Sequence, residues 1–251
     1  MIQFGAGRLF SYMTHDAQGN AIAVPQAVQF GVLQNVDLDI SFEEKMLYGA
    51  KQFPVAVARG KGKIEGKSKI GSFNGRILGD YVFGSSGAAG ERGLVADYAA
   101  TVPTTPFQVT VAPPNSGAIA TDLGVRNATT GLALTRVASS PSTGEYSVSG
   151  AVYTFASADA GNAVLISYDY TASSTTAKVG TISNLLMGYT PFFGVRLQRE
   201  YKGKKMYLSL VSCSSSSFSL PAQNDDFVIA DFNFAALSND ADVVGYWSTS
   251  E

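Results

Sequence analysis

An alternation of basic and small residues between Val55 and Ile70 constrains the fold of this chain more than any other feature. All five cations of this stretch occupy odd positions, namely Arg59, Lys61, Lys63, Lys67 and Lys69. From Gly60 to Ile70, glycine, serine and isoleucine fill the even positions, so the two sets of side chains lie on opposite faces of an extended strand. A second segment, Val36–Phe42, alternates apolar and polar residues in the same way. We therefore expect two strands, the first of which buries one face.

Two shorter segments complete this region. Residues 43–53 separate the two strands and are interpreted as a charged loop that closes on Tyr48 and Gly49. From Ser72 to Phe83 the apolar residues recur at helical spacing behind a serine that can cap a helix. The region is thus predicted to be strand, loop, long basic strand and short helix.

The composition favours a mainly β protein. Apolar residues make up 45% of the 251-residue chain and charged residues only 15%, so it has enough apolar material to fold. Serine, threonine and glycine are abundant, and long uninterrupted helical patterns are missing. This length accommodates one large β domain, or one domain with a smaller companion.

The composition changes between about residues 96 and 177, where Lys and Arg become rare and Thr, Ser, Ala and Val dominate. Several short alternating segments fall here, and Ala163–Thr171 is the strongest of them. We interpret 96–177 as a small all-β module inserted into a discontinuous main domain made of 1–95 and 178–251.

Few residues could support catalysis or metal binding. The chain has a single histidine, His15, and a single cysteine, Cys213. These cannot form a structural zinc site or an intramolecular disulfide, and no nucleophile or phosphate-loop motif occurs. The net charge of −2 gives no general attraction to nucleic acid. The sequence predicts no enzyme, no cofactor and no metal, and it shows neither a secretory signal nor an apolar run that would span a membrane.

Two charged features allow more than one interpretation. Asp37 and Asp39 lie about 7 Å apart on one strand face, a separation seen in inverting glycosidases, although a solvated strand face is the favoured interpretation. The basic strand could contact phosphates. However, no aromatic residues alternate with its cations, so a solvated face or a charged contact between subunits is preferred.

The stretch from Val36 to Gly84 resembles the tail tube (major tail) proteins of long-tailed bacteriophages. The resemblance rests on VDLDISFEEKMLYGAKQFPVAVARGKGKIEGKSKIGSFNGRIL, with a short helix ending near Gly84. The segment GEYSVSGAVYTFASADAGNAVLISYDYT also resembles modules embedded in such proteins. Together the quoted segments make up 71 of the 251 residues.

The resemblance implies a β-sandwich or barrel-forming domain with one short packed helix. Six subunits would form a ring, and rings would stack into a tube that conducts genome DNA without binding it specifically. Other tail proteins (tip, terminator and tape measure) would be the further partners, no membrane would be involved, and the protein would assemble in the host cytoplasm and reside in the virion tail. The alternative is a phage decoration or surface-binding protein that uses the inserted module.

The same resemblance assigns roles to residues. Asp37 and Asp39 are expected to line the channel, with the basic strand away from it or paired with acids of the next subunit. The apolar face of the first strand is expected to pack on the helix. The strand face consists of Val36, Leu38, Ile40 and Phe42, and the helix face consists of Phe73, Ile77 and Tyr81. The expected subunit or ring contacts are Glu43, Glu44, Tyr48, Phe53, Pro54, Arg59, Lys61 and Lys63.

Overall fold

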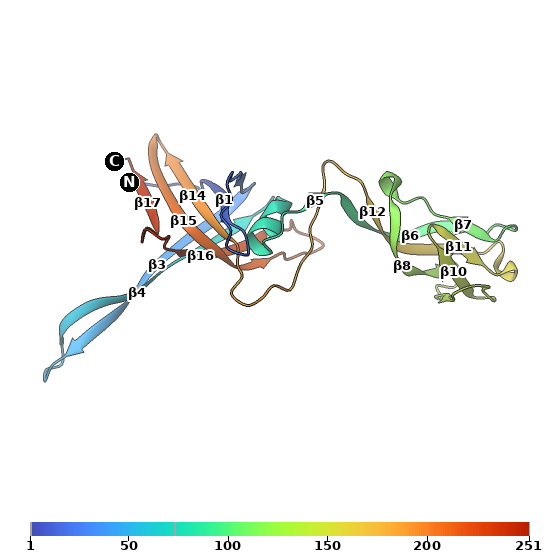
Figure 1. Cartoon of the computed structure of the whole chain (residues 1–251), viewed down its shortest axis with the longest axis horizontal. Coiled ribbons are helices and arrows are strands. Elements are labelled where there is room, and N and C mark those ends of the chain that lie inside the picture. The colour runs from blue at the N-terminus through green and yellow to red at the C-terminus, as the bar shows by residue number, and fades with distance from the viewer. Residues whose placement is uncertain (1, 73, 251) are drawn as a thin grey trace. The chain divides into compact units, whose positions relative to one another are not determined.

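The structure, a computed structural model, describes residues 2–72 and 74–250 and is mainly β. It divides into two compact units: unit 1 comprises Met1–Gly87 and Gly180–Glu251, and unit 2 comprises Ala88–Val179 (Figure 1). Unit 2 extends beyond both ends of the predicted inserted module, residues 96–177. The change in composition comes later than the change in structure, because a strand that starts at Glu91 already belongs to unit 2.

Unit 1 is built on one antiparallel sheet. Its strands are β1 (Arg8–His15), β2 (Ala27–Gln29), β3 (Leu33–Tyr48), β4 (Pro54–Ile70), β14 (Phe192–Tyr201), β15 (Lys204–Ser219), β16 (Ala230–Leu237) and β17 (Gly245–Thr249). The order across the sheet is β2-β1-β14-β15-β16-β4-β3, and β17 pairs with the other end of β15. The sheet therefore combines strands from both ends of the chain with the hairpin β3–β4, which lies at one edge of the sheet.

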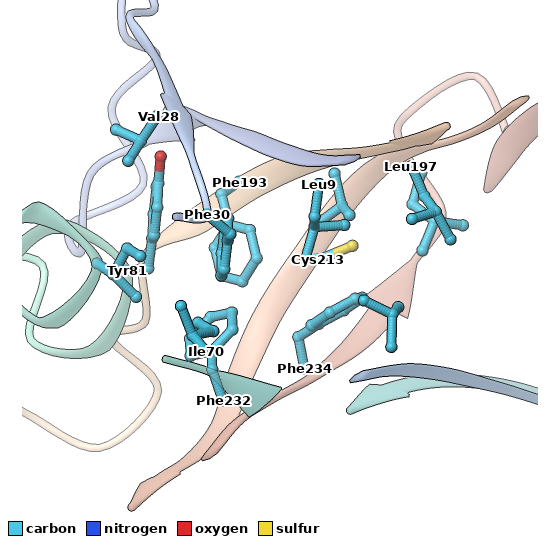
Figure 2. Packing of buried hydrophobic residues seen from close by; sticks show 14 of the residues in the cluster. Leu9, Val28, Phe30, Ile70, Tyr81, Phe193, Leu197, Cys213, Phe232 and Phe234 are labelled. Carbon is cyan, nitrogen blue, oxygen red and sulfur yellow. The ribbon is translucent and has the colours of Figure 1, made fainter. Parts of the chain in front are cut away.

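An aromatic cluster fills the core of unit 1 (Figure 2). Period-two alternation aims Phe193 of β14 and Phe232 and Phe234 of β16 to the same side of the sheet, and all three are buried. The rings of Phe193 and Phe232 lie 5.8 Å apart. Rings at such separations contribute about 0.5–1.5 kcal/mol beyond their burial, so this cluster ties β14 and β16 together.

A short helix covers one end of this core. The predicted helix of residues 72–83 is realised as a π-helix, η1 (Ile77–Val82), with Ile77 and Tyr81 buried. The Tyr81 ring lies 4.9 Å from that of Phe193. Phe73, predicted to share this face, lies outside the described residues.

Only part of the predicted strand face reaches the helix. Val36 is buried in the same cluster as Ile77 and Tyr81, and Leu38 packs against it. Ile40 and Phe42 are 55% and 49% exposed, so their expected packing on the helix is wrong. The core ends near Leu38, because β3 and β4 continue past the neighbouring strand β16, which pairs with β4 only between Glu65 and Ile70.

Gly66 provides a close backbone approach within the sheet. A Cβ added at this position would collide with the ring of Phe234, on the neighbouring strand β16. The Phe234 ring thus occupies the space that the side chain of any residue other than glycine would need at position 66.

Unit 2 has its own core and several short strands. Its elements are β5 (Ala88–Ala89), β6 (Glu91–Thr101), β7 (Gln108–Thr110), η2 (Pro114–Ser116), β8 (Ala118–Asn127), β9 (Thr135–Arg136), β10 (Glu145–Ser149), β11 (Val152–Phe155), η3 (Ser157–Asp159), β12 (Ala163–Ala172) and β13 (Lys178–Val179). The larger sheets are β7-β11-β10-β9 and β6-β12-β8. Strand β12 alternates strictly and buries Val164, Ile166, Tyr168 and Tyr170.

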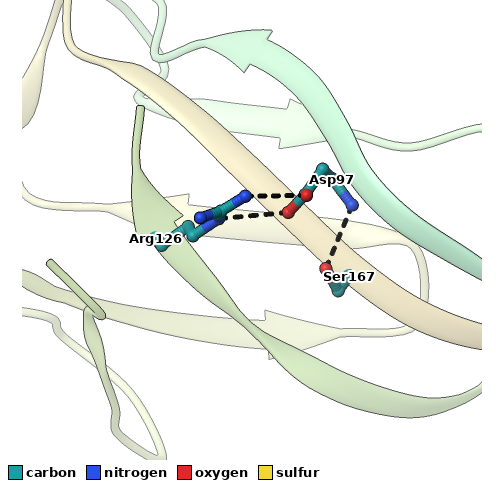
Figure 3. A network of polar contacts seen from close by, with 3 residues as sticks. All are labelled: Asp97, Arg126 and Ser167. Atoms are coloured by element: carbon teal, nitrogen blue, oxygen red, sulfur yellow. Dashed lines mark hydrogen bonds and ion pairs between the residues drawn. The ribbon is translucent and has the colours of Figure 1, made fainter. Parts of the chain in front are cut away.

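A bulge in β6 is held by the polar network of Figure 3. Asp97 has a φ of 58°, where the register between β6 and β12 shifts. Its backbone N–H donates to Ser167 Oγ at 3.1 Å, and Arg126 donates to both carboxylate oxygens of Asp97 at 3.1 and 2.7 Å. This bidentate pair compensates for a backbone conformation that is unfavourable for a residue with a Cβ.

We predict that Gly66→Ala destabilises unit 1, because the new methyl group and the Phe234 ring cannot share the same space. The expected loss is about 1–3 kcal/mol, the range for overpacking a core. The matched control is Gly75→Ala, where an added Cβ meets nothing within 4 Å. Urea unfolding of both variants measures the difference, and equal midpoints would contradict the assigned contact.

We also predict that unit 1 folds after residues 88–179 are deleted and Gly87 is joined to Gly180. A Cβ added at Gly180 would lie 3.9 Å from the Gly87 Cα, so the cut ends are already neighbours. Circular dichroism and a cooperative thermal transition would report folding. An insoluble or non-cooperative product would show that unit 1 depends on unit 2.

Candidate assembly interface

The hairpin β3–β4 contains all ten residues that the sequence assigned to a site. From Leu33 to Leu38 its strands belong to the sheet, but residues 41–63 form a two-stranded ribbon that projects from it, here called the arm (Figure 1). The predicted charged loop 43–53 is wrong in extent, because β3 continues to Tyr48 and only residues 49–53 form the turn. Register shifts between Phe42 and Glu44 and near Tyr48 break the period-two pattern that would have indicated a strand.

Aspartates and lysines share one sheet face at the base of the arm. Asp37 lies directly opposite Lys67, and Asp39 directly opposite Glu65. Directly opposed residues point to the same face of an antiparallel pair. The expectation that the basic strand lies apart from Asp37 and Asp39 therefore fails for Lys67, and this surface, here called the charged face, is mixed in sign.

Local contacts at the charged face reinforce that mixture. Asn35 Nδ2 donates to Asp37 Oδ2 at 2.8 Å, and Lys63 Nζ lies 2.8 Å from Glu65 Oε1. On the next strand Asp231 is opposite Lys69. Asp37 and Asp39 thus stand on an open sheet face among lysines, an arrangement suited to solvation and surface contacts.

The arm exposes apolar side chains at its tip and along its length. Phe53 is 80% exposed, and six further residues are also exposed: Phe42, Met46, Leu47, Tyr48, Val55 and Val57. Seven of the eight predicted contact residues are exposed in the structure, and Pro54 is partly buried. The Arg59 guanidinium lies 4.6 Å from the centre of the Phe42 ring, which orders both side chains by a cation–π contact.

A groove lies between β3 and the strands β14, β15 and β17. It has a volume of about 520 Å³ and is lined mainly by apolar side chains of β3, β14, β15 and β17, among them Leu38, Ile40, Met206, Leu208 and Trp247. Arg199 Nη2 donates to the Val36 backbone oxygen at 2.6 Å and so links β14 to β3. Trp247 is 74% exposed at this groove.

Sequence reasoning missed this groove and a second apolar surface. Residues 181–191 form an irregular segment without strand structure. This segment exposes Ile182, Leu186 and Met187. The isolated Trp247 could have indicated the groove, but the other residues that line it come mostly from three other strands, β3, β14 and β15.

A partly buried polar cluster lies in unit 2, around Asp122, whose side chain is only 4% exposed. This carboxylate accepts hydrogen bonds from the hydroxyls of Tyr146 and Tyr153 at 2.8 and 3.1 Å, and Arg136 lies 3.6 Å away. Burial, and then the Asp122 carboxylate, raise the pKa of both phenols well above their ordinary value. The phenols therefore act as protonated hydrogen-bond donors that satisfy the buried carboxylate.

Neither a metal cluster nor a membrane helix is found in the described part of the chain. No group of three or more His, Cys, Asp and Glu side chains there could hold a metal ion. No helix within residues 2–72 and 74–250 has the length and hydropathy to cross a bilayer. No protein-family model matches the sequence, and no curated protein matches it either.

We predict that alkaline pH destabilises unit 2 through Tyr146 and Tyr153. In the unfolded chain these phenols lose their protons near their ordinary pKa of about 10, while the folded state retains them. Their contribution to stability is complete below that pH and is lost as pH rises through the folded-state pKa. Thermal unfolding between pH 8 and 11 should show this loss, and it should be weaker in Tyr146→Phe/Tyr153→Phe. Tyr48→Phe, at an exposed residue, is the control that should leave the pH dependence unchanged.

Proposed function

We propose that this chain is a structural subunit of a bacteriophage tail tube, which assembles into six-membered rings that stack into a conduit for genome DNA. The arm is the observation that carries this proposal. Eight residues of β3 beyond Ile40 extend it by about 27 Å as a ribbon, at the rise of an antiparallel strand. A two-stranded ribbon is marginally stable alone in water, and exposed apolar side chains on it indicate a surface that another molecule covers.

The outer edge of β3 supports the same proposal. This strand has 16 residues and stands last in the sheet order, where β4 is its only partner among the described strands. A long free strand edge pairs readily with another chain, and a closed ring of copies removes every such edge. Self-association through strand pairing is therefore consistent with a tube wall.

The charged face is consistent with passage of DNA without retention. Uniformly basic surfaces bind the phosphate backbone, whereas interspersed signs provide no continuous attraction. Asp37, Asp39, Glu65 and Asp231 balance Lys63, Lys67 and Lys69 on the strands β3, β4 and β16. In the proposed tube, this face with Asp37 and Asp39 lines the channel.

The alternative is a decoration protein that binds a virion or host surface through unit 2. Its support is that unit 2 has a separate core and is compact in itself. Negative-stain electron microscopy with light scattering across a concentration series separates the two proposals. Rings of six or hollow tubes are expected for the tail tube; monomers that bind virions would instead establish the decoration protein.

We predict that Leu47→Ser/Phe53→Ser impairs assembly while the subunit stays folded, because both side chains are exposed on the arm. In the proposed interface these two side chains become buried. Their loss should raise the protein concentration needed for assembly at least tenfold, a change of about 1.4 kcal/mol. Leu94→Ser/Leu132→Ser in unit 2 is the matched control, since these leucines are also exposed. Light scattering and thermal unfolding measure the two effects; assembly equal to that of the control would exclude the arm as a contact.

A further inference from the structure

The guanidinium of Arg199 lacks an acidic partner at the groove. Its Nη2 is bound to the Val36 oxygen, but its Nε is buried with no hydrogen-bond partner. No ion pair joins Arg199 to a carboxylate among the described residues. Burying a guanidinium donor without an acceptor is costly, and an incoming carboxylate would remove that cost.

The arm carries the complementary charge beside apolar side chains. Glu43 and Glu44 are exposed and form no ion pair within the part of the chain that the structure describes. Arg59, which lies opposite Glu44 in the hairpin, stacks instead on the Phe42 ring. Phe42 and Met46 flank the two acids and are themselves exposed. This segment of the arm thus offers a carboxylate between two apolar groups. The groove offers mainly apolar walls, with Arg199 and Asp37 as its charged lining residues, and no ion pair joins these two.

The acids of the arm cannot reach the groove of their own chain. Arg199 is bound to the oxygen of Val36, and Glu44 lies eight residues further along the same extended strand. At the rise of a β-strand, this separation is about 27 Å. Any contact between these groups must therefore join two copies.

We propose that the groove between β3 and β17 receives the arm of a second copy, with a carboxylate of Glu43 or Glu44 on Arg199 and Phe42 and Met46 against the apolar walls. This assignment rests on the proposed function and names the surface through which one subunit engages the next. The two surfaces differ, so the contact is head-to-tail and propagates to a ring or a filament. The groove volume falls within the range of sites that bury a ligand, about 300–1,000 Å³.

Charge reversal tests the pairing in the full-length chain. Arg199→Glu should raise the concentration needed for assembly at least tenfold, and so should Glu43→Arg or Glu44→Arg, whichever residue is the partner. Combining Arg199→Glu with the correct arm variant should restore assembly to within about threefold of wild type, because the pair is re-formed with opposite signs. Arg92→Glu and Asp225→Arg, at exposed residues, are controls that should assemble normally.

Disulfide trapping gives a second measurement that does not depend on the stability of the Arg199 variant. Met46→Cys combined with Met206→Cys should give intermolecular cross-links under mild oxidation. Met46→Cys combined with Leu94→Cys should not. The native Cys213 does not interfere, because it is buried and burial raises its pKa to about 12.

The outcomes separate the two proposals. If wild type assembles but neither double charge reversal recovers assembly and the Met46–Met206 pair does not cross-link, the groove assignment is overturned and the proposed function stands. If wild type stays monomeric at every concentration and no pair cross-links, the proposed function is overturned as well. Recovery with one arm variant and selective cross-linking would establish the contact.

Discussion

The structure of unit 1 depends on the packing of three phenylalanines across the strand β15. Phe193, Phe232 and Phe234 lie on β14 and β16, to either side of β15, and η1 closes over them through Tyr81. Gly66 allows β4 to lie beside Phe234, and so connects the hairpin β3–β4 to this core. Without that close approach the base of the arm would have no fixed support, and its exposed tip would have no defined direction.

The sequence predicted those features that depend on short-range periodicity. The mainly β class followed from alternation and composition, and β4 follows the basic alternation between Val55 and Ile70 closely. The short helix also lies within its predicted range, because Ile77 and Tyr81 both face the core. These signals are local: each needs only the residues of one element.

Features that depend on register or on distant partners could not be predicted in this way. The bulge near Glu44 shifts the alternation of β3, so a strand was interpreted as a loop. The pairing of Asp37 with Lys67 requires the register of two strands, which the turn alone does not specify. The groove around Arg199 combines four strands whose order in the sheet is not their order in the chain. The eight candidate contact residues all fall on the arm, but its form as a projecting ribbon was not predicted.

The pairing of β1 with β14 has a consequence for synthesis of the protein. Arg8 pairs with Gln198, so β1 cannot form its pairing with β14 until about 190 further residues have been synthesised. During translation the hairpin β3–β4 emerges early, and all of unit 2 can fold before β14 leaves the ribosome. The sheet beneath the arm forms last, because contacts between distant segments are the slowest to close. A nascent chain therefore presents the apolar residues of the arm before the sheet that supports them has formed.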